Sequence, residues 1–597
     1  MLVFGDQVRT SETRARLAGL STSLAGIAAA RPGIDRHSAL ASAFIDASAV
    51  AQAIADAEFA VRGCDDRSAA QDAAMTLVMA LARALGCSWD SAFRAPVTIP
   101  RIELRRLASS ILPDALEWKV AEGFAFYAVY PEAYWRAAAA CEGVSRVVGI
   151  RSIGLPLAAM VAARLGAGRP LTVRPIGDPF RRTLSLAPAY AADLAHGGSV
   201  AIVDEGPGLS GSSFGALAEH LGARGLPEHR VRFFPSHRGG PGPEAEPGWR
   251  EAWLRSRRHV VAVDDLILQP SDPARHLASW FEDLLGKATE PLRDLSGGAW
   301  RALHFRSPAE WPPANLHQER RKLLLRTETG DYLLKFVGLG PEGMRKAERA
   351  KALAAAGFAP ETFGYRHGFL AERWLSEAVP LRPRGFDRAR LIETLGRYIA
   401  FRIGRFPAAR DDGARFETLI GMARRNTSLA LGAAAAERLP PRPPAGLFGG
   451  RIETDGRMHP WEWLALPDGR LLKADGVDHH AAHDLIGCQD PAWDVAGATI
   501  ELGLTAQEQR TLLAAVAEQS GRSIDPRLVA FLTPCYLAFQ LGAAKLAADA
   551  LATACPDEAA RLRAERSRYA QLLTTSLEAA GSAGAGLVAA AAASPSL

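Results

Sequence analysis

The segment Val200–Phe214, VAIVDEGPGLSGSSF, constrains the fold of this chain more than any other stretch. Four consecutive apolar residues predict a buried strand. Two adjacent acids, Asp204 and Glu205, follow at its carboxyl end, and a loop of Gly and Ser then leads directly into a helical stretch. A buried strand that passes through a loop of small residues into a helix indicates a parallel sheet with α/β architecture.

The flanking sequence extends this prediction over residues 119–295. Short apolar, β-branched or aromatic runs are separated by Ala-rich helical stretches, which is the alternation expected of an α/β domain. The expected strands are 124–130, 146–150, 171–175, 200–203, 231–234 and 259–268, and the expected helices are 155–165, 214–221 and 274–285.

The loop that follows Asp204 and Glu205 has the chemistry of a phosphate-binding loop. Small residues allow backbone N–H groups to close on a phosphate, and the following helix N-terminus adds a partial positive charge. The acids above the loop can accept hydrogen bonds from a ribose diol. The segment is not a Walker loop, because Gly-Lys-Ser/Thr is absent. It matches the dinucleotide-binding pattern GxGxxG only formally, and it does not match the nucleophile-elbow pattern GxSxG. A Gly/Ser turn without a ligand is the structural alternative.

The same segment resembles the phosphoribosyl-diphosphate signature of type I phosphoribosyltransferases, and residues 147–163, VVGIRSIGLPLAAMVAA, resemble that family's diphosphate loop. The resemblance covers about 119–265. Two departures are a Glu as the second acid and a loop one residue longer, with Pro207 inside it. The resemblance implies binding of a phosphoribosyl diphosphate with Mg²⁺. The implied contacts are Arg151, Gly154, Asp204, Glu205, Ser210, Gly211, Ser212 and Ser213.

A change in composition at residues 296–298 marks the start of another domain. Residues 320–326 and 332–337 predict a β-hairpin, 344–356 a helix and 369–374 a further strand. Lys335 lies on the second strand of the hairpin and Glu348 on the next helix. A Lys on a strand with a Glu on the following helix is an arrangement that holds nucleotide phosphates, although Lys–Glu pairs are also common on surfaces.

Three acidic segments follow between 452 and 498. Asp455 precedes an apolar stretch, Asp475 ends another strand-like run, and residues 487–497, GCQDPAWDVAG, lead into a helix. Phosphoryl transfer needs one carboxylate to orient the acceptor hydroxyl and at least one to hold Mg²⁺ against the triphosphate. Two Asp on loops after adjacent strands can meet in one cleft.

This order resembles the small-molecule phosphotransferases of the aminoglycoside and choline kinase type, over about 300–580. The resemblance implies ATP as substrate, contacts from Lys335 and Glu348, a catalytic Asp455, and Mg²⁺ ligands Asp475 and Glu462; Asp494 is expected to brace the catalytic loop. Three departures are visible, the first of which is that no glycine-rich loop precedes Arg320. The His-Gly-Asp start of the catalytic loop reads Glu453-Thr-Asp455, and Glu462 stands in place of the metal-binding Asn.

The remaining sequence bounds the function further. A formal charge of +5 over 597 residues gives no electrostatic case for nucleic acid. The six Cys form no CxxC pair, which argues against a zinc-cysteine site. The start of the chain lacks the apolar core of a signal peptide, and 528–544 predicts a buried helix rather than a membrane span. These features predict a cytoplasmic protein with small-molecule partners, as a monomer or a homodimer.

The predicted organisation is a multidomain α/β and α+β protein. It consists of a helical region at 1–118 that serves as a cap or a dimerisation element, a phosphoribosyltransferase-like domain at 119–295, a two-lobed kinase-like domain at 296–580 and a disordered tail at 581–597. Residues 478–484, which include Asp478, His479, His480, His483 and Asp484, are expected to form a polar helix start rather than a transition-metal site.

The leading hypothesis is a two-activity enzyme, in which one domain binds a ribose phosphate and the other transfers the γ-phosphate of ATP to a small molecule. The alternative is a regulatory or sensor protein that binds nucleotides without turnover. A third hypothesis keeps only the ribose-phosphate transferase active.

Overall fold

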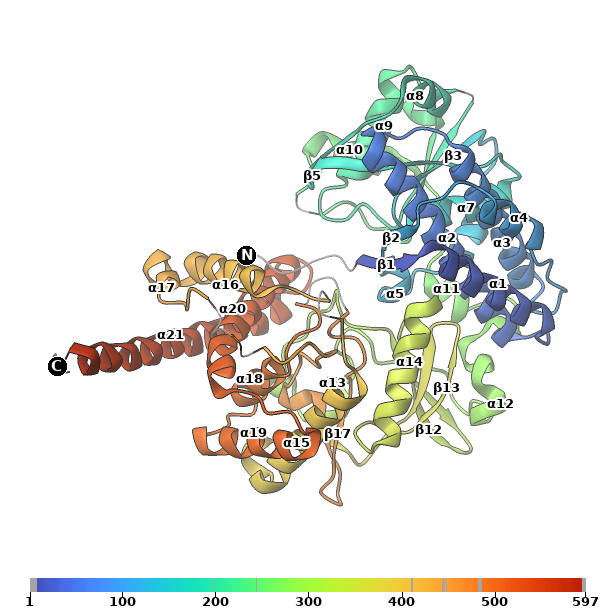
Figure 1. The fold of residues 1–597 in the computed structure, drawn as a ribbon. Coiled ribbons are helices and arrows are strands. Elements are labelled where there is room, and N and C mark those ends of the chain that lie inside the picture. Colours follow the sequence, from blue (N-terminus) through green and yellow to red (C-terminus); the bar gives the residue numbers. More distant parts are fainter. Residues whose placement is uncertain are drawn as a thin grey trace.

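The computed structural model describes residues 8–196, 198–242, 244–409, 412–442, 446, 448–481 and 486–592. Figure 1 shows the N-terminal helices together with the parallel sheet at one end of the molecule. An antiparallel sheet occupies the middle, and a helical unit forms the other end, from which the C-terminal helix projects. The predicted mixture of α/β and α+β parts is therefore present.

The N-terminal region is helical, as predicted, with one addition. Its helices are α1 (Thr13–Ala29), α2 (Ile34–Arg62), α3 (Ala69–Asp90) and α4 (Arg101–Ala108). The side chain of Ser68 caps α3 by accepting from the backbone N–H of Gln71. Strand β1 (Val8–Glu12) pairs antiparallel with β2 (Ala115–Lys119), so the predicted boundary at 118/119 falls inside a strand.

The α/β prediction is confirmed by a five-stranded sheet in the order β4-β3-β7-β8-β9, with every neighbouring pair parallel. Its strands are β3 (Arg146–Ile150), β4 (Leu171–Val173), β7 (Val200–Val203), β8 (Val231–Phe234) and β9 (Arg257–Arg258). Helices α7 (Gly154–Leu165), α8 (Pro188–Ala195), α9 (Ser212–Ala223) and α10 (Pro247–Arg255) belong to this domain. All four residues of β7 are fully buried, as expected of a central parallel strand.

Three segments of this domain differ from the prediction. Residues 124–130 are not a strand but belong to α5 (Glu122–Ala125) and the loop before α6 (Pro131–Ala138). Residues 259–268 contain α11 (Val263–Ile267), and 274–285 is divided among η2 (Pro273–Arg275), η3 (Leu277–Phe281) and α12 (Glu282–Leu285). Short apolar runs do not distinguish a strand from a buried turn of helix. Between β4 and α8 the chain forms a hairpin of β5 (Pro175–Asp178) and β6 (Arg181–Leu184).

The second sheet is antiparallel, in the order β10-β11-β12-β14-β13. Its strands are β10 (Arg293–Asp294), β11 (Lys322–Thr327), β12 (Gly330–Phe336), β13 (Thr362–Arg366) and β14 (Phe369–Arg373). The predicted hairpin is confirmed as β11–β12, and α14 (Gly340–Ala355) follows it.

The last part of the chain is mainly helical around a small sheet. The sheet has the order β15 (Val379–Pro380), β16 (Trp463–Ala465), β17 (Leu471–Lys473). The helices are α15 (Arg388–Arg405), α16 (Phe416–Leu431), α17 (Ala433–Glu437), α18 (Ala492–Glu501), α19 (Ala506–Ser520), α20 (Pro526–Leu551) and α21 (Pro556–Ala592). The predicted disordered tail at 581–597 overlaps α21, whose bounds extend to Ala592, and residues 593–597 lie outside the described part.

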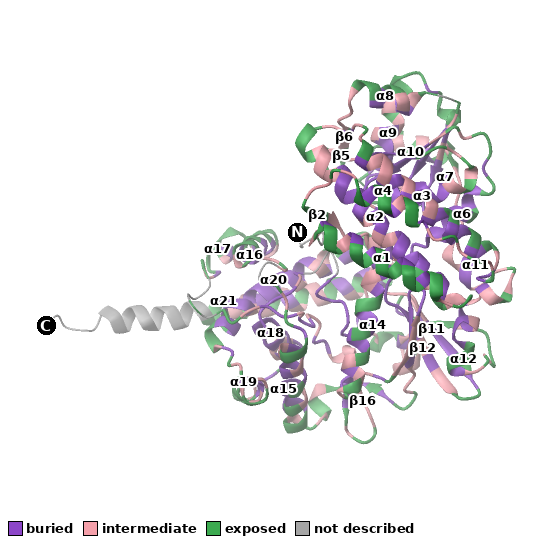
Figure 2. Cartoon of the chain, turned by 45° about the vertical axis from the view of Figure 1, so that its right-hand side comes forward, coloured by how far each residue is buried: buried purple, intermediate pink, exposed green. Residues whose placement is uncertain are grey.

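A continuous apolar core joins the first three parts of the chain. Leu40 of α2, Leu157 of α7 and Leu334 of β12 belong to the same buried cluster. Figure 2 shows buried residues running from the N-terminal helices into the strands of the antiparallel sheet. Helices α2 and α20 are long and apolar enough to cross a membrane by length and composition, but their apolar windows are 67% and 72% buried inside the structure. The buried core helices of globular proteins can be equally long and apolar.

Candidate active site in the cleft of the C-terminal unit

The candidate site is a cavity of about 280 Å³ between the antiparallel sheet and the helical unit. Strand β12 contributes Lys335 and β14 contributes Glu372. The segment between β10 and β11 covers the cavity with Trp300, Glu319 and Arg320. Helices α20 and α21 and the loops around β16 and β17 form the opposite wall.

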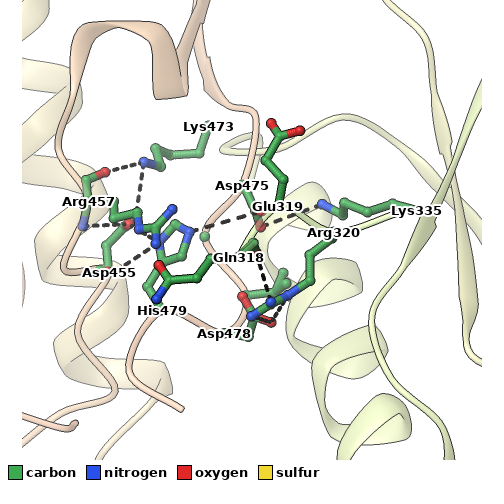
Figure 3. Close-up of polar contacts among 12 residues, drawn as sticks. Gln318, Glu319, Arg320, Lys335, Asp455, Arg457, Lys473, Asp475, Asp478 and His479 are labelled. Atoms are coloured by element: carbon green, nitrogen blue, oxygen red, sulfur yellow. Dashed lines mark hydrogen bonds and ion pairs between the residues drawn. The ribbon is translucent and has the colours of Figure 1, made fainter. Parts of the chain in front are cut away.

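Lys335 lies where the sequence predicted a phosphate-binding cation. Its Nζ is 3.6 Å from Oδ1 of Asp475 (Figure 3) and 3.1 Å from Oε2 of Glu372. Its side chain is almost completely buried. Burial alone would lower the pKa of Lys335, but Asp475 and Glu372 outweigh burial and raise this pKa. Lys335 is therefore a fixed positive charge on the wall of the cavity.

The expected pairing of Lys335 with Glu348 is wrong. Glu348 is exposed on α14, and the carboxylate beside Lys335 comes instead from Glu372 on β14, the next strand of the same sheet. Lys346, two positions before Glu348 on α14, is the residue that points inward. It lies on the face of α14 that packs against the core.

Lys346 and Arg320 bind the same carboxylate at the edge of the cavity. Nζ of Lys346 is 3.0 Å from Oδ2 of Asp478, and the guanidinium of Arg320 donates to this oxygen at 3.3 Å. Burial lowers the pKa of Lys346 to about 8, although Asp478 opposes this shift. The two cations keep the pKa of the buried Asp478 well below its usual range.

The parallel-sheet domain contributes to this cleft through α5 and the residues that follow it. The carbonyl of Ala125 accepts a 2.7 Å hydrogen bond from Nζ of Lys346. The ring of Phe126 lies 4.0 Å from Nζ of Lys346 and 4.8 Å from the guanidinium carbon of Arg320, which are cation–π distances. Tyr127 lines the cavity itself. The cleft is thus completed by a segment from outside the predicted kinase-like domain.

Asp455, the predicted catalytic carboxylate, is completely enclosed. Its Oδ2 accepts from the hydroxyl of Tyr398 and lies 3.3 Å from Nζ of Lys473, while its Oδ1 lies 3.0 Å from Nδ1 of His479. Burial opposes ionisation, but Lys473, His479 and Arg402 outweigh it and hold the pKa of Asp455 below its usual range.

The cavity wall beside Asp455 is formed by its neighbours. Arg457 and His479 line the cavity, and Lys473 donates a 2.6 Å hydrogen bond to the carbonyl of Arg457 (Figure 3). The Asp455 carboxylate therefore does not line the cavity itself, whereas His479, which it contacts, does. The sequence hypothesis did not single out Lys473 or Arg457.

The expected brace of this loop is present. Both carboxylate oxygens of Asp494, in the first turn of α18, accept backbone N–H bonds, from Asp455 at 2.9 Å and from Gly456 at 2.8 Å. Burial, followed by repulsion from Asp455, raises the pKa of Asp494 to about 6.

The cavity also contains a set of groups suited to a divalent cation. Ligand atoms of Asp475, Asp478 and His479 all lie within 4.8 Å of one another. Oδ1 of Asp475 is buried and has no hydrogen-bond partner among the described residues. Carboxylate oxygens are the donors that Mg²⁺ prefers, so Asp475 and Asp478 fit this ion. Glu462 lines the same cavity, and its carbonyl accepts from the backbone N–H of Ala474 at 2.9 Å.

The polar helix start expected at 478–484 is not formed by the described residues. Asp478, His479 and His480 lie in bends and turns, and the carboxylate and imidazole of the first two point into the cleft. The other two members of the predicted cluster, His483 and Asp484, lie outside the described residues.

The predicted phosphate loop has the expected position in the parallel sheet. Asp204 and Glu205 follow β7, and Gly211, at φ +68°, precedes Ser212 and Ser213 in the first turn of α9. The hydroxyls of Ser210 and Ser212 donate to the carbonyl of Pro179, at 3.3 and 2.8 Å. The β5–β6 hairpin therefore covers the loop.

The structure shows different surroundings for the two predicted diphosphate contacts upstream of this loop, Gly154 and Arg151. Gly154 starts α7, and a Cβ at this position would lie 2.5 Å from the carbonyl oxygen of Val203, so close approach of α7 to β7 requires glycine here. The guanidinium of Arg151 is buried and pairs with Asp56 at 2.8 Å and with Asp65. Its predicted role as a diphosphate contact is not supported, because the N-terminal helical region neutralises it.

The acid pair itself predicts a pH effect on stability. Burial raises the pKa of Asp204 to about 7; burial and repulsion from Asp204 raise that of Glu205 to about 8, against a hydrogen bond from the backbone of Gly123. Carboxyls of unfolded chains titrate near pH 4. Between about pH 4 and 8 the folded state therefore binds more protons than the unfolded state, and this pair lowers stability as pH rises.

We expect Glu205→Gln to remove part of this loss. The melting temperature of the variant should exceed that of the wild type increasingly as the pH is raised from 5 to 8.5, as measured by thermal unfolding monitored by circular dichroism. Glu219→Gln, at an exposed position of α9, should leave the pH profile unchanged. A constant difference between Glu205→Gln and the wild type over this range would contradict the assigned titration.

No protein-family model matches this sequence, and no curated protein matches it. Solved structures resemble part of it. Choline kinase LicA from Streptococcus pneumoniae has 16% identity over 43% of this chain and 89% of its own, with a TM-score of 0.29. A choline/ethanolamine kinase family protein from Mesorhizobium loti has 18% identity over 52% and 95%, with a TM-score of 0.29. Spectinomycin phosphotransferase, in complex with ADP and spectinomycin, has 9% identity over 50% and 98%, with a TM-score of 0.34. Matches this remote concern fold alone, so any conclusion about activity depends on the geometry of the cleft.

Proposed function

We propose that the C-terminal unit is an ATP- and Mg²⁺-dependent phosphotransferase that acts on a hydroxyl group of a small molecule. The observation that carries this proposal is the convergence of Lys335, Asp475, Asp478 and His479 on one cavity of about 280 Å³. A fixed cation, two carboxylates of which one has an oxygen without a hydrogen-bond partner among the described residues, and a cavity beside them are what positioning of a triphosphate requires.

We assign different roles to the groups that line the cavity. Lys335 and Arg320, on the side of the antiparallel sheet, contact the phosphates. Asp475 and Asp478 hold Mg²⁺, which when bound neutralises charge on the phosphate oxygens. Tyr127, Trp300 and Trp374 supply apolar wall to the same cavity.

His479 is the group that we assign to the acceptor. Donation of its Nδ1–H to Asp455 fixes the tautomer and leaves Nε2 as a hydrogen-bond acceptor on the cavity side. In the reaction, the acceptor oxygen bonds to the γ-phosphorus, the bond from that phosphorus to the ADP oxygen breaks, and the hydroxyl proton passes to Nε2. Asp455 is a positioning residue in this proposal and does not touch the acceptor.

Nucleotide binding without transfer is the competing function, and two observations favour it. The predicted catalytic carboxylate of Asp455 is enclosed, and Arg457, two residues later, lines the cavity. Under this alternative the protein binds ATP with Mg²⁺ but moves no phosphoryl group to any acceptor.

The test is transfer of radiolabelled γ-phosphate from ATP into a small-molecule extract. Wild type should label a product, and Asp475→Asn should reduce labelling by at least about 100-fold, because it removes charge stabilisation at the transferring group. ATP affinity of this variant should fall mainly when Mg²⁺ is present. Asp468→Asn, an exposed Asp on the β16–β17 turn, is the matched control and should behave as wild type.

The possible results separate the two functions. Labelling by wild type that is lost in Asp475→Asn supports the transferase. ATP binding without labelling by any protein supports the binding function. An equal loss of ATP affinity with and without Mg²⁺ would show that Asp475 is structural.

A ribose-phosphate site at the phosphate loop is a second proposal. It is supported by the two acids that follow β7, whose pKa values are raised by burial, and by the Gly/Ser loop that leads from them into α9. Asp204→Asn combined with Glu205→Gln should abolish binding of phosphoribosyl diphosphate in isothermal titration while the fold is retained. Unchanged binding by the double variant would remove this assignment.

A further inference from the structure

Three titratable side chains from three parts of the chain meet at one completely buried point. His37 comes from α2, Glu132 from α6 and His367 from the turn between β13 and β14, and each is 0% exposed. This cluster lies outside the cleft and outside the phosphate loop. The proposed function uses none of its members.

The separations of the donor atoms have the dimensions of a metal site. Nε2 of His37 is 3.0 Å and Nε2 of His367 is 3.3 Å from Oε1 of Glu132. One ligand atom from each residue lies within 4.8 Å of the other two. Zinc with bonds of about 2.0–2.1 Å in tetrahedral geometry places neighbouring donors about 3.3 Å apart.

Hydrogen bonding within the described residues leaves this cluster incomplete. Oε2 of Glu132 and both ring nitrogens of His367 are buried without a hydrogen-bond partner there, so His367 approaches the carboxylate without the geometry of a hydrogen bond. A buried polar group left unpaired destabilises the folded state. A cation held by Oε1 of Glu132 and by Nε2 of His37 and His367 would give Nε2 of His367 the partner that it lacks among the described residues.

The surroundings hold the two imidazoles in place. Nδ1 of His37 is hydrogen-bonded to Oγ of Ser88 at 2.9 Å, which is the outer contact that metal-bound histidines usually make through their second nitrogen. The backbone carbonyl of His367 accepts from the hydroxyl of Tyr130 at 2.9 Å. The rings of Phe93 and Trp280 lie 4.7 and 5.5 Å from the imidazoles and form an apolar wall around the cluster.

We propose that His37, Glu132 and His367 bind a zinc-type divalent cation that joins the helical region, the parallel-sheet domain and the antiparallel sheet. Two imidazoles and one carboxylate are a zinc donor set, whereas Mg²⁺ prefers oxygen ligands. A cation here ties together segments 95 and 235 residues apart in the sequence. This inference does not depend on the proposed phosphotransferase.

The experiment measures metal in the purified full-length chain. After zinc supplementation and dialysis, elemental analysis should find about one zinc per chain in the wild type and in His229→Ala, whose side chain is exposed. His367→Ala and Glu132→Gln should lose this zinc. Cobalt substitution should give the visible absorption of a tetrahedral site.

The cleft cluster is the main competitor for the metal, and Asp475→Asn separates the two sites. Zinc retained by Asp475→Asn and lost from His367→Ala supports the proposal, and the reverse pattern overturns it. If His367→Ala and Glu132→Gln do not fold, metal binding by the wild type alone still tests the proposal. A chelator should lower the melting temperature of the wild type and zinc should restore it, whereas a wild type that binds neither zinc nor cobalt contains only a hydrogen-bonded cluster and the proposal is wrong.

Discussion

Replacement of His479 by Gln should lower the rate of γ-phosphate transfer about 10²- to 10⁴-fold, the usual contribution of a positioned proton acceptor. ATP affinity should change little, because Nε2 of His479 serves the acceptor and the transition state rather than the bound nucleotide. Gln cannot take the proton. The measurement is the rate of label transfer into the small-molecule extract, together with ATP binding by calorimetry.

The control for this variant is His317→Gln, on the segment that covers the cleft but with an exposed side chain; it should transfer label at the wild-type rate. Asp455→Asn should reduce transfer through His479, and Asp455→Glu should restore part of the rate if the role of Asp455 is to position His479. Wild-type transfer by His479→Gln would remove His479 from the mechanism.

Replacement of Lys335 by Met should produce the largest combined loss of stability and binding. The substitution leaves the carboxylates of Glu372 and Asp475 buried without the cation between them. Breaking a buried ion pair from one side costs about 3–5 kcal/mol, and loss of the phosphate contact should weaken ATP binding at least about 100-fold. Urea unfolding and calorimetric titration with ATP–Mg²⁺ measure the two effects.

Lys351→Met, at an exposed position on α14, should change neither quantity by a measurable amount. Circular dichroism at the titration temperature confirms that Lys335→Met is folded when its affinity is measured. A folded Lys335→Met with wild-type ATP affinity would place the phosphates elsewhere in the cavity, away from β12.

Much of the secondary structure could be predicted because it depends on short-range pattern. Runs such as Val200–Val203 are apolar and β-branched, and each is followed by small residues and an Ala-rich stretch. Strand period and helix period therefore identify β3, β7, β8 and the β11–β12 hairpin without tertiary information. Lys335 and Asp475 were singled out in the same way, by their places on and after strands, whereas Asp494 was expected only from the resemblance to aminoglycoside and choline kinases.

Contacts between segments distant in the sequence were not predictable from such patterns. Helical spacing placed Glu348 and Lys346 on the same helix, but only the packing of α14 against α2 and α5 decided that Lys346 points inward. Arg151 fits a diphosphate loop by its position, yet two Asp from the N-terminal helical region bind it. Lys473 is one of only eight Lys in the chain and stands in an apolar run, a signal of burial that did not identify Asp455 as its partner.

The sequence by itself determined many of the strands and helices, among them β3, β7, β8 and the β11–β12 hairpin, and which residue types could perform phosphate chemistry, because these follow from local periodicity and side-chain chemistry. Only the tertiary structure decided that Asp455 is enclosed, that His479 and Asp478 face the cavity, that the parallel-sheet domain completes the cleft, and that His37, Glu132 and His367 meet. The physical reason is burial. Whether a charged group is a ligand, a positioning residue or a structural ion pair depends on its solvent access and on its neighbours in space, and both are set by long-range packing.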